Sequence, residues 1–132
     1  MRYIKSYNES KSFFTYSNLM EEMKDILLPI SDMGYEIKTE LNKTKDPYEI
    51  YVRIVTYLNP TLEWDEEIES ELIRLNEFSS DNGFKISKVN YVLEEGYSGV
   101  TMANFDVFLD TMNNKENKGM TNLLLVLEQI SR

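Results

Sequence analysis

Apolar and polar positions along the chain follow two periods, and the change from one period to the other occurs twice at a similar sequence. Residues 31–38 (SDMGYEIK) and 80–87 (SDNGFKIS) each contain a glycine, and the two glycines lie 49 positions apart. Before each glycine the apolar residues recur with helical spacing, and after it they alternate with polar residues as in a strand that has one solvated face. The pattern therefore predicts two helix-hairpin units of similar length, over residues 15–58 and 64–109.

The first unit begins with an apolar stripe over residues 16–30 that predicts a helix, kinked near Pro29 and ended by Gly34. Residues 35–41 and 49–58 then alternate as the two strands of a hairpin. The second of these strands carries Ile50, Val52, Ile54 and Leu58 on one face and Tyr51, Arg53, Val55 and Tyr57 on the other.

The second unit starts with Asp65 as the predicted N-cap of a helix whose first turn is rich in glutamate. A change of face at Ser87-Lys88 predicts a bulge in the strand that follows this helix. Residues 100–109 alternate as a strand, although so short a run does not distinguish a strand from a helix. Helical spacing is also present, at Phe105, Phe108, Leu109 and Met112. A shift of 49 positions places the second strand of the first unit on residues 98–107, and for this reason we predict a strand over residues 100–109.

A last apolar stripe predicts a C-terminal helix over residues 119–131. Together the elements predict an α+β fold in a single domain, 1–132, in which duplicated helix-hairpin units form a four-stranded antiparallel sheet with helices packed on one face. Residues 1–14 are interpreted as either a leader or an edge strand. If residues 2–7 pair with the sheet, the first part of the chain has the ferredoxin-like order β-α-β-β-α-β.

Composition excludes several classes of chemistry. The 132 residues contain neither cysteine nor histidine, which excludes disulfides and thiolate chemistry and removes the commonest general base and transition-metal ligand. The formal net charge of −9 disfavours binding to the phosphates of nucleic acids. The longest wholly apolar run, residues 123–127, is too short to cross a bilayer. We therefore expect no nucleic acid and no membrane as partner, and a cytoplasmic location.

The opening sequence, MRYIKSYNE, resembles the M-K-x-I-K-x-F/Y-x-E starts that are common on small uncharacterised proteins of large tailed bacteriophages. Some leaders of this type direct proteins into the phage head before they are removed by proteolysis. In the head-protease pattern a Leu or Ile stands two positions before the cleaved Glu, and in this chain Tyr7 stands at that place before Glu9. The resemblance implies a phage accessory or virion-associated protein, located in the host cytoplasm or in the virion.

The strand face that points away from the helices is the candidate binding surface. We expect it to present Tyr51, Arg53 and Tyr57, joined by Asp106 from the other unit. Aromatic rings and a guanidinium group give contact area and directional hydrogen bonds at modest entropy cost, which is typical of recognition surfaces. The alternative interpretation is a solvated sheet face on which Arg53 forms a plain cross-strand pair.

No catalytic or metal-binding residue is predicted. The carboxylate pairs Asp106/Asp110 and Glu94/Glu95 lack the loop spacing of a calcium-binding hand, and we interpret them as solvated acids on turns and helix ends. The chain has no phosphate-cradling glycine loop and no serine in a nucleophile elbow, so no cofactor is expected.

These observations favour a small non-enzymatic interaction module that binds a protein partner through the sheet face, or pairs with itself there as a homodimer. The alternative hypothesis is a protein that sequesters a nucleotide-like molecule in a pocket between the duplicated halves. In that case the tyrosines would stack on the ligand and Arg53 would hold its charge.

Overall fold

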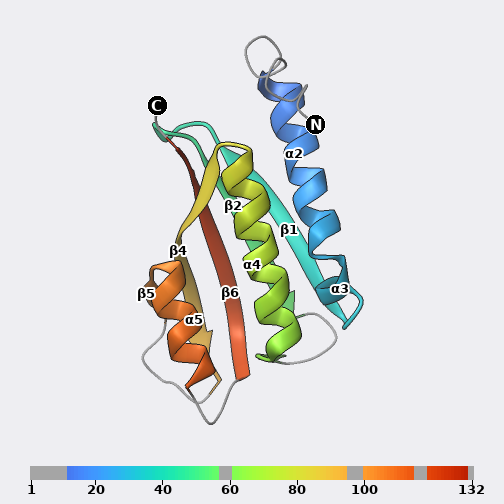
Figure 1. Cartoon of the computed structure of the whole chain (residues 1–132), viewed down its shortest axis with the longest axis vertical. Coiled ribbons are helices and arrows are strands. Elements are labelled where there is room, and N and C mark those ends of the chain that lie inside the picture. The colour runs from blue at the N-terminus through green and yellow to red at the C-terminus, as the bar shows by residue number, and fades with distance from the viewer. Residues whose placement is uncertain (1–11, 57–60, 95–99, 115–118, 131–132) are drawn as a thin grey trace.

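A six-stranded antiparallel sheet forms one layer of the computed structural model, which describes residues 12–56, 61–94, 100–114 and 119–130, and helices cover one face of this sheet (Figure 1). The elements in chain order are α2 (Ser12–Ile26), α3 (Leu28–Ser31), β1 (Tyr35–Asn42), β2 (Glu49–Thr56), β3 (Leu62–Glu63), α4 (Glu66–Asp81), β4 (Phe84–Leu93), β5 (Thr101–Ala103), α5 (Phe105–Asn113) and β6 (Gly119–Gln129). The α+β class is confirmed. The prediction of four strands is wrong, because β3 and β6 form where no strand was expected.

Pro29 and Gly34 act on the first helical stretch as predicted. The helix α2 ends at Ile26, and α3 starts at Leu28 with Pro29 in its first turn, where the missing N–H has no intrahelical partner to lose. Gly34 then has a φ of 102°, a conformation that residues with a Cβ rarely adopt. The chain therefore turns sharply from α3 into β1.

The predicted first hairpin and second helix are confirmed. β1 and β2 pair antiparallel along their full length. The helix α4 begins after Asp65, whose Oδ1 accepts a hydrogen bond from the backbone N–H of Ile68 at 2.9 Å. The predicted bulge in β4 is also present, because the pairing of β4 with β6 shifts register between Ile86 and Lys88.

Residues 100–109 do not form the predicted strand. β5 ends at Ala103, and α5 follows with Asn104 as its N-cap, whose Oδ1 accepts a hydrogen bond from the backbone N–H of Val107 at 2.8 Å. The helical spacing rather than the shift of 49 positions decides the structure here, since a helix brings the apolar side chains of this segment onto one face. The residues buried on that face are Phe105, Phe108 and Met112.

The largest correction concerns residues 119–131, which were predicted as a helix. Residues 119–129 form β6, which lies between β2 and β4 and pairs with both of them. Leu123, Leu125 and Leu127 are buried on the helix side of the sheet. The residues between them, Leu124 and Val126, are apolar as well, so the strand has no polar side at its centre. A short apolar run of this type cannot be told from a buried helix by periodicity.

The strand order of the sheet is β1-β2-β6-β4-β5, and β3 pairs with β6. Because β2 and β4 are each antiparallel to β6, they are parallel to each other, and α4 connects them as in a split β-α-β unit. The duplication is not confirmed, since the β4–β5 hairpin has three residue pairs and β6 separates it from the first hairpin. Residues 2–7, on which the ferredoxin-like order depended, lie outside the described residues.

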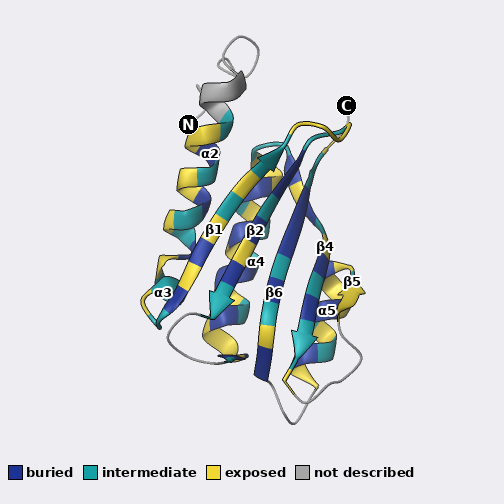
Figure 2. Cartoon of the chain, turned by 180° about the vertical axis from the view of Figure 1, so that it is seen from behind, coloured by how far each residue is buried: buried dark blue, intermediate teal, exposed yellow. Residues whose placement is uncertain are grey.

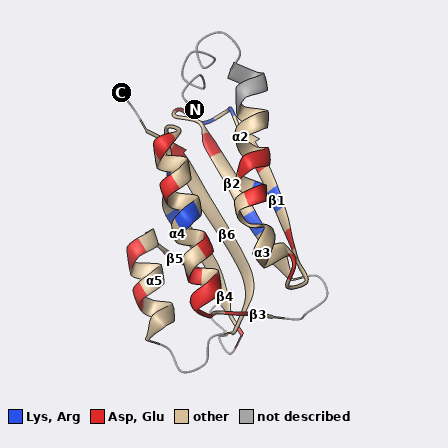
Figure 3. Ribbon diagram, turned by 45° about the vertical axis from the view of Figure 1, so that its right-hand side comes forward, with Lys and Arg blue, Asp and Glu red and all other residues tan. Residues whose placement is uncertain are grey.

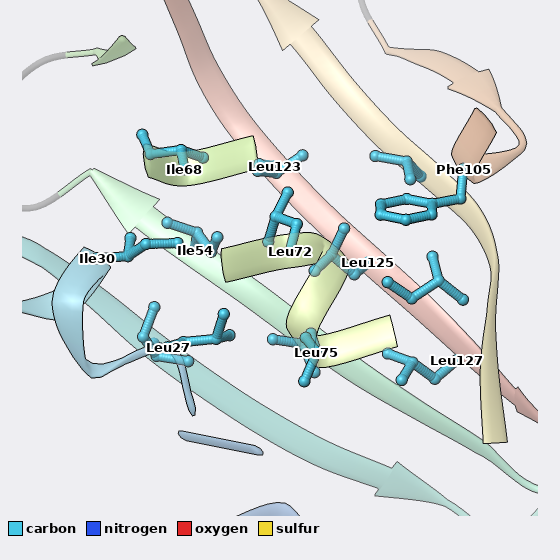
Figure 4. Packing of buried hydrophobic residues seen from close by; sticks show 14 of the residues in the cluster. Leu27, Ile30, Ile54, Ile68, Leu72, Leu75, Phe105, Leu123, Leu125 and Leu127 are labelled. Carbon is cyan, nitrogen blue, oxygen red and sulfur yellow. The ribbon is translucent and has the colours of Figure 1, made fainter. Parts of the chain in front are cut away.

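The hydrophobic core lies between the helices and the sheet (Figure 4). In this view side chains of the helical segments meet side chains of the strands, and burial of each aliphatic side chain contributes about 1.5–3 kcal/mol. The core residues labelled in the figure are Leu27, Ile30, Ile54, Ile68, Leu72, Leu75, Phe105, Leu123, Leu125 and Leu127. The opposite face of the sheet does not take part in this core.

Candidate functional site

The sheet face opposite the helices has no second layer over it in the described part of the chain (Figure 2). Side chains alternate between the two faces of a strand, and directly paired residues share a face, so the registers define which residues lie here. We call this surface the open face. It consists of Glu36, Lys38, Glu40 and Asn42 of β1, Glu49, Tyr51, Arg53 and Val55 of β2, Asn122, Leu124, Val126 and Glu128 of β6, and Lys85, Lys88, Asn90 and Val92 of β4.

The structure brings two of the four predicted binding residues onto the open face. Tyr51 is half-buried there and Arg53 is exposed. Tyr57 lies outside the described residues. Asp106 is exposed in the first turn of α5, on the helix side of the sheet, so it does not join the other residues. Its placement in the prediction depended on a strand at residues 100–109, which the structure does not contain.

Tyr51 is held in place by a small polar network at one end of the open face. Its hydroxyl donates a hydrogen bond to Oε1 of Glu49 at 2.8 Å and accepts one from Nδ2 of Asn42 at 3.2 Å. Glu49 is only 8% exposed although it carries a carboxylate. These contacts fix the ring across β1 and β2, so little side-chain freedom remains to be lost when a partner binds.

The centre of the open face is apolar, and β6 supplies most of it. Val126 is 2% exposed, although it does not belong to the core between the helices and the sheet. Its direct cross-strand partners are Tyr51 and Lys88. Leu124, the next residue on this face of β6, is partly exposed. Sequence reasoning missed both β6 residues because it predicted a helix there; the continuous apolar run was the available signal for a buried strand.

The helices that cover the sheet carry mostly acidic charged residues (Figure 3). The helices α2, α4 and α5 carry eleven acidic and two basic residues. On the four long strands β1, β2, β4 and β6, every charged residue lies on the open face, and the two signs balance. The basic residues are Lys38, Arg53, Lys85 and Lys88, and the acidic ones are Glu36, Glu40, Glu49 and Glu128. The helix side is thus strongly negative, and the open face is neutral.

A shallow depression of about 340 Å³ lies where α4, β4, the start of α5 and β6 meet. Lys85, Asp106 and Glu128 are among the residues that line it, whereas Tyr51 and Arg53 are not. One ammonium group beside two carboxylates is a poor match for an anionic ligand. The depression therefore does not have the features that the sequestration hypothesis required, namely stacked tyrosines and an arginine.

Asn76, which also lines this depression, covers part of the edge of β4. β5 covers only residues 89–91 of β4, and Asn76 Oδ1 accepts a hydrogen bond from the backbone N–H of Ile86 at 3.0 Å. A buried or half-buried backbone donor left unpaired is costly. The contact between α4 and β4 thus blunts an edge that would otherwise invite pairing with another strand.

Among the residues that the structure describes, no group of three or more acidic side chains is arranged to hold a metal ion. The helices described in the structure are all too short or too polar to span a membrane. Comparisons of the chain with protein-family models, with curated proteins and with solved structures find no match. The open face is therefore the feature of the molecule that bears most directly on function.

Proposed function

We propose that this chain is a small non-enzymatic protein-interaction module that binds a protein partner through the open face. The observation that carries the proposal is an uncovered sheet face with an apolar centre and a charged rim. Val55, Val92 and Leu124 are partly exposed there, and apolar side chains gathered on an uncovered face often mark a partner site. A centre of aromatic and aliphatic side chains inside a polar rim is the usual organisation of protein interfaces.

Tyr51 and Arg53 are the residues expected to contribute most to binding. Tyrosine and arginine are over-represented among residues whose truncation costs the most binding energy. Tyr51 is already fixed by its hydrogen bonds to Glu49 and Asn42, so its burial at an interface costs little conformational entropy. Arg53 is exposed and free to form a bidentate hydrogen bond or to stack on a ring.

A protein is favoured over a nucleic acid as the partner. Binding to a phosphate backbone needs an excess of basic groups along one surface, and the open face has as many acidic as basic residues while the helices are strongly acidic. The resemblance of the N-terminal sequence suggests the setting: an accessory or virion-associated protein of a phage, acting in the host cytoplasm or in the virion.

Photo-crosslinking from the two sides of the molecule tests the proposal. Benzoylphenylalanine at position 55, on the open face, is expected to give a discrete protein adduct in cells, because Val55 lies partly exposed beside Tyr51 and Arg53. The same probe at position 22, an exposed site on α2, is the matched control and should give none. The change Tyr51→Ala should reduce the adduct severalfold without lowering the Tm by more than a few degrees.

Adducts that form from position 22 but not from position 55 would contradict the proposal. So would equal labelling from the two positions, since it would indicate random collisions rather than a binding surface.

A further inference from the structure

We infer that the protein bound on the open face is a second copy of this chain, related to the first by a two-fold axis that runs across the strands. The inference rests on the proposed function and names its partner. Two adjacent rows of directly paired residues lie at the centre of the open face. One row is Glu40, Tyr51, Val126 and Lys88, and the next is Lys38, Arg53, Leu124 and Asn90.

The second row contains an unfavourable pair. Lys38 and Arg53 are directly opposed on neighbouring strands, and in the described part of the chain neither forms a salt bridge. Like charges placed directly opposite each other destabilise a sheet. A carboxylate brought over this pair from outside would relieve the repulsion between Lys38 and Arg53.

If the two-fold axis passes between the two rows, the second copy supplies such a carboxylate. This axis lays each strand over the same strand of the second copy and exchanges the rows, so that Glu40 faces Lys38 of the second copy. Tyr51 then faces Arg53 of the second copy, an arrangement that suits a cation–π contact. Leu124 lies over the shielded position of Val126. Each contact occurs twice, because an interface of this symmetry uses the same patch on both copies.

The other simple arrangement, with the axis along the strands, is disfavoured. It lays β2 over β6 and β1 over β4, so Lys38 would face Asn90, Arg53 would face Leu124, and no carboxylate would reach the like-charged pair. Glu40 would meet Lys88, but Glu49 and Glu128 would also face each other twice across the interface. Like-charge contacts of this kind suppress association. Packed sheets cross at about 30°, a rotation that shifts the rim by a few ångströms, within reach of lysine and glutamate side chains.

The area of the open face and the charge of the helix side both favour the open face as the dimer interface. Four strands spaced about 4.8 Å apart and at least eight residues long span roughly 19 by 26 Å, which gives about 500 Å² per copy. The total of about 1,000 Å² is the minimum expected of a biological interface. The helix side cannot serve instead, because two copies carrying eleven acidic and two basic residues on their helices repel each other.

The test is the mass of the full chain in solution, measured by sedimentation equilibrium, with charge variants of the edge strand β1. The native chain of 15.6 kDa should show twice that mass. Glu40→Lys and Lys38→Glu each place like charges opposite each other twice, and each should raise the dissociation constant at least about tenfold. The double variant Glu40→Lys/Lys38→Glu restores opposite charges, and its dissociation constant should return close to that of the native chain.

The matched controls are Glu21→Lys and Lys24→Glu on α2, which make the same charge changes on the helix side and should leave the dimer intact. Thermal unfolding of every variant shows that the fold is retained. A monomer at the highest soluble concentration overturns the inference, and so does a dimer that only the α2 variants dissociate or that the double variant fails to restore. A monomer that still gives an adduct from position 55 would leave the proposed function standing, whereas a monomer without adducts would overturn both.

Discussion

At the scale of single residues, Asn113 joins three parts of the chain. Its Oδ1 accepts a hydrogen bond from Nε1–H of Trp64 at 2.9 Å, and its Nδ2 donates one to Oε2 of Glu69 at 2.9 Å. Trp64 is 4% exposed and packs edge-on against the ring of Phe108, with centroids 5.2 Å apart. The sequence around Asn113 indicates only a polar loop, because the partner of its side chain lies 49 residues away.

The change Asn113→Ala should lower the free energy of unfolding by about 1–3 kcal/mol, because it leaves a buried indole N–H without an acceptor. Urea denaturation followed by the fluorescence of Trp64, the only tryptophan of the chain, measures the loss at the affected site. Glu69→Gln is the control: it keeps an acceptor for Asn113 and should change stability by less than about 0.5 kcal/mol. An equally small effect of Asn113→Ala would show that water replaces the contact.

The predictions that depend on single residues agree best with the structure. Pro29, Gly34 and Asp65 were each expected to end, turn or start an element, and each does so in the structure. Their effects follow from local covalent geometry and from nearby backbone groups, which the sequence contains in full. Tyr51 and Arg53 were placed on the correct face for a similar reason, since alternation along one strand fixes which side chains share a side.

At the scale of elements, β6 shows where sequence reasoning fails. Residues 119–131 satisfy the pattern of a helix, and the type of element was decided by pairing with β2 and β4, which are distant in sequence. Leu124 and Val126 were therefore missed as the apolar centre of the open face. Asp106 was misplaced because the apparent repeat was given more weight than the N-cap and helical spacing of α5.

The two interpretations of residues 119–131 predict opposite effects at neighbouring leucines. A helix over residues 119–131 would turn Leu124 inward together with Leu123 and Leu127 and would leave Leu125 on its flank; in β6, Leu125 is fully buried and Leu124 is on the open face. Leu125→Ala should thus cost about 2–5 kcal/mol of unfolding free energy. Leu124→Ala should cost clearly less, and urea denaturation of the two variants compares them directly. The reverse order would contradict the strand.

At the scale of the whole molecule, the helix layer and the sheet layer have different properties. The helix layer closes the core and carries most of the negative charge. The sheet layer has one face in the core and one face with an apolar centre and balanced charges. In the ferredoxin-like order β-α-β-β-α-β, the strand that lies between the two parallel strands of the split β-α-β unit is the first strand of the sequence. In this protein the strand between β2 and β4 is β6, which lies near the C-terminus. That late strand gives the open face its apolar centre.

Methyl NMR spectra of the labelled chain, recorded in buffer over a concentration series and in cell extract, test most directly whether the open face is the binding surface. We predict chemical-shift changes or broadening at Val55, Val92 and Leu124, because a partner on the open face covers their methyl groups. Leu28 and Val107, which are 52% and 50% exposed outside the open face, are the reference and should remain unchanged. Changes confined to Leu28 and Val107, with the open-face methyl groups unaffected, would contradict the account.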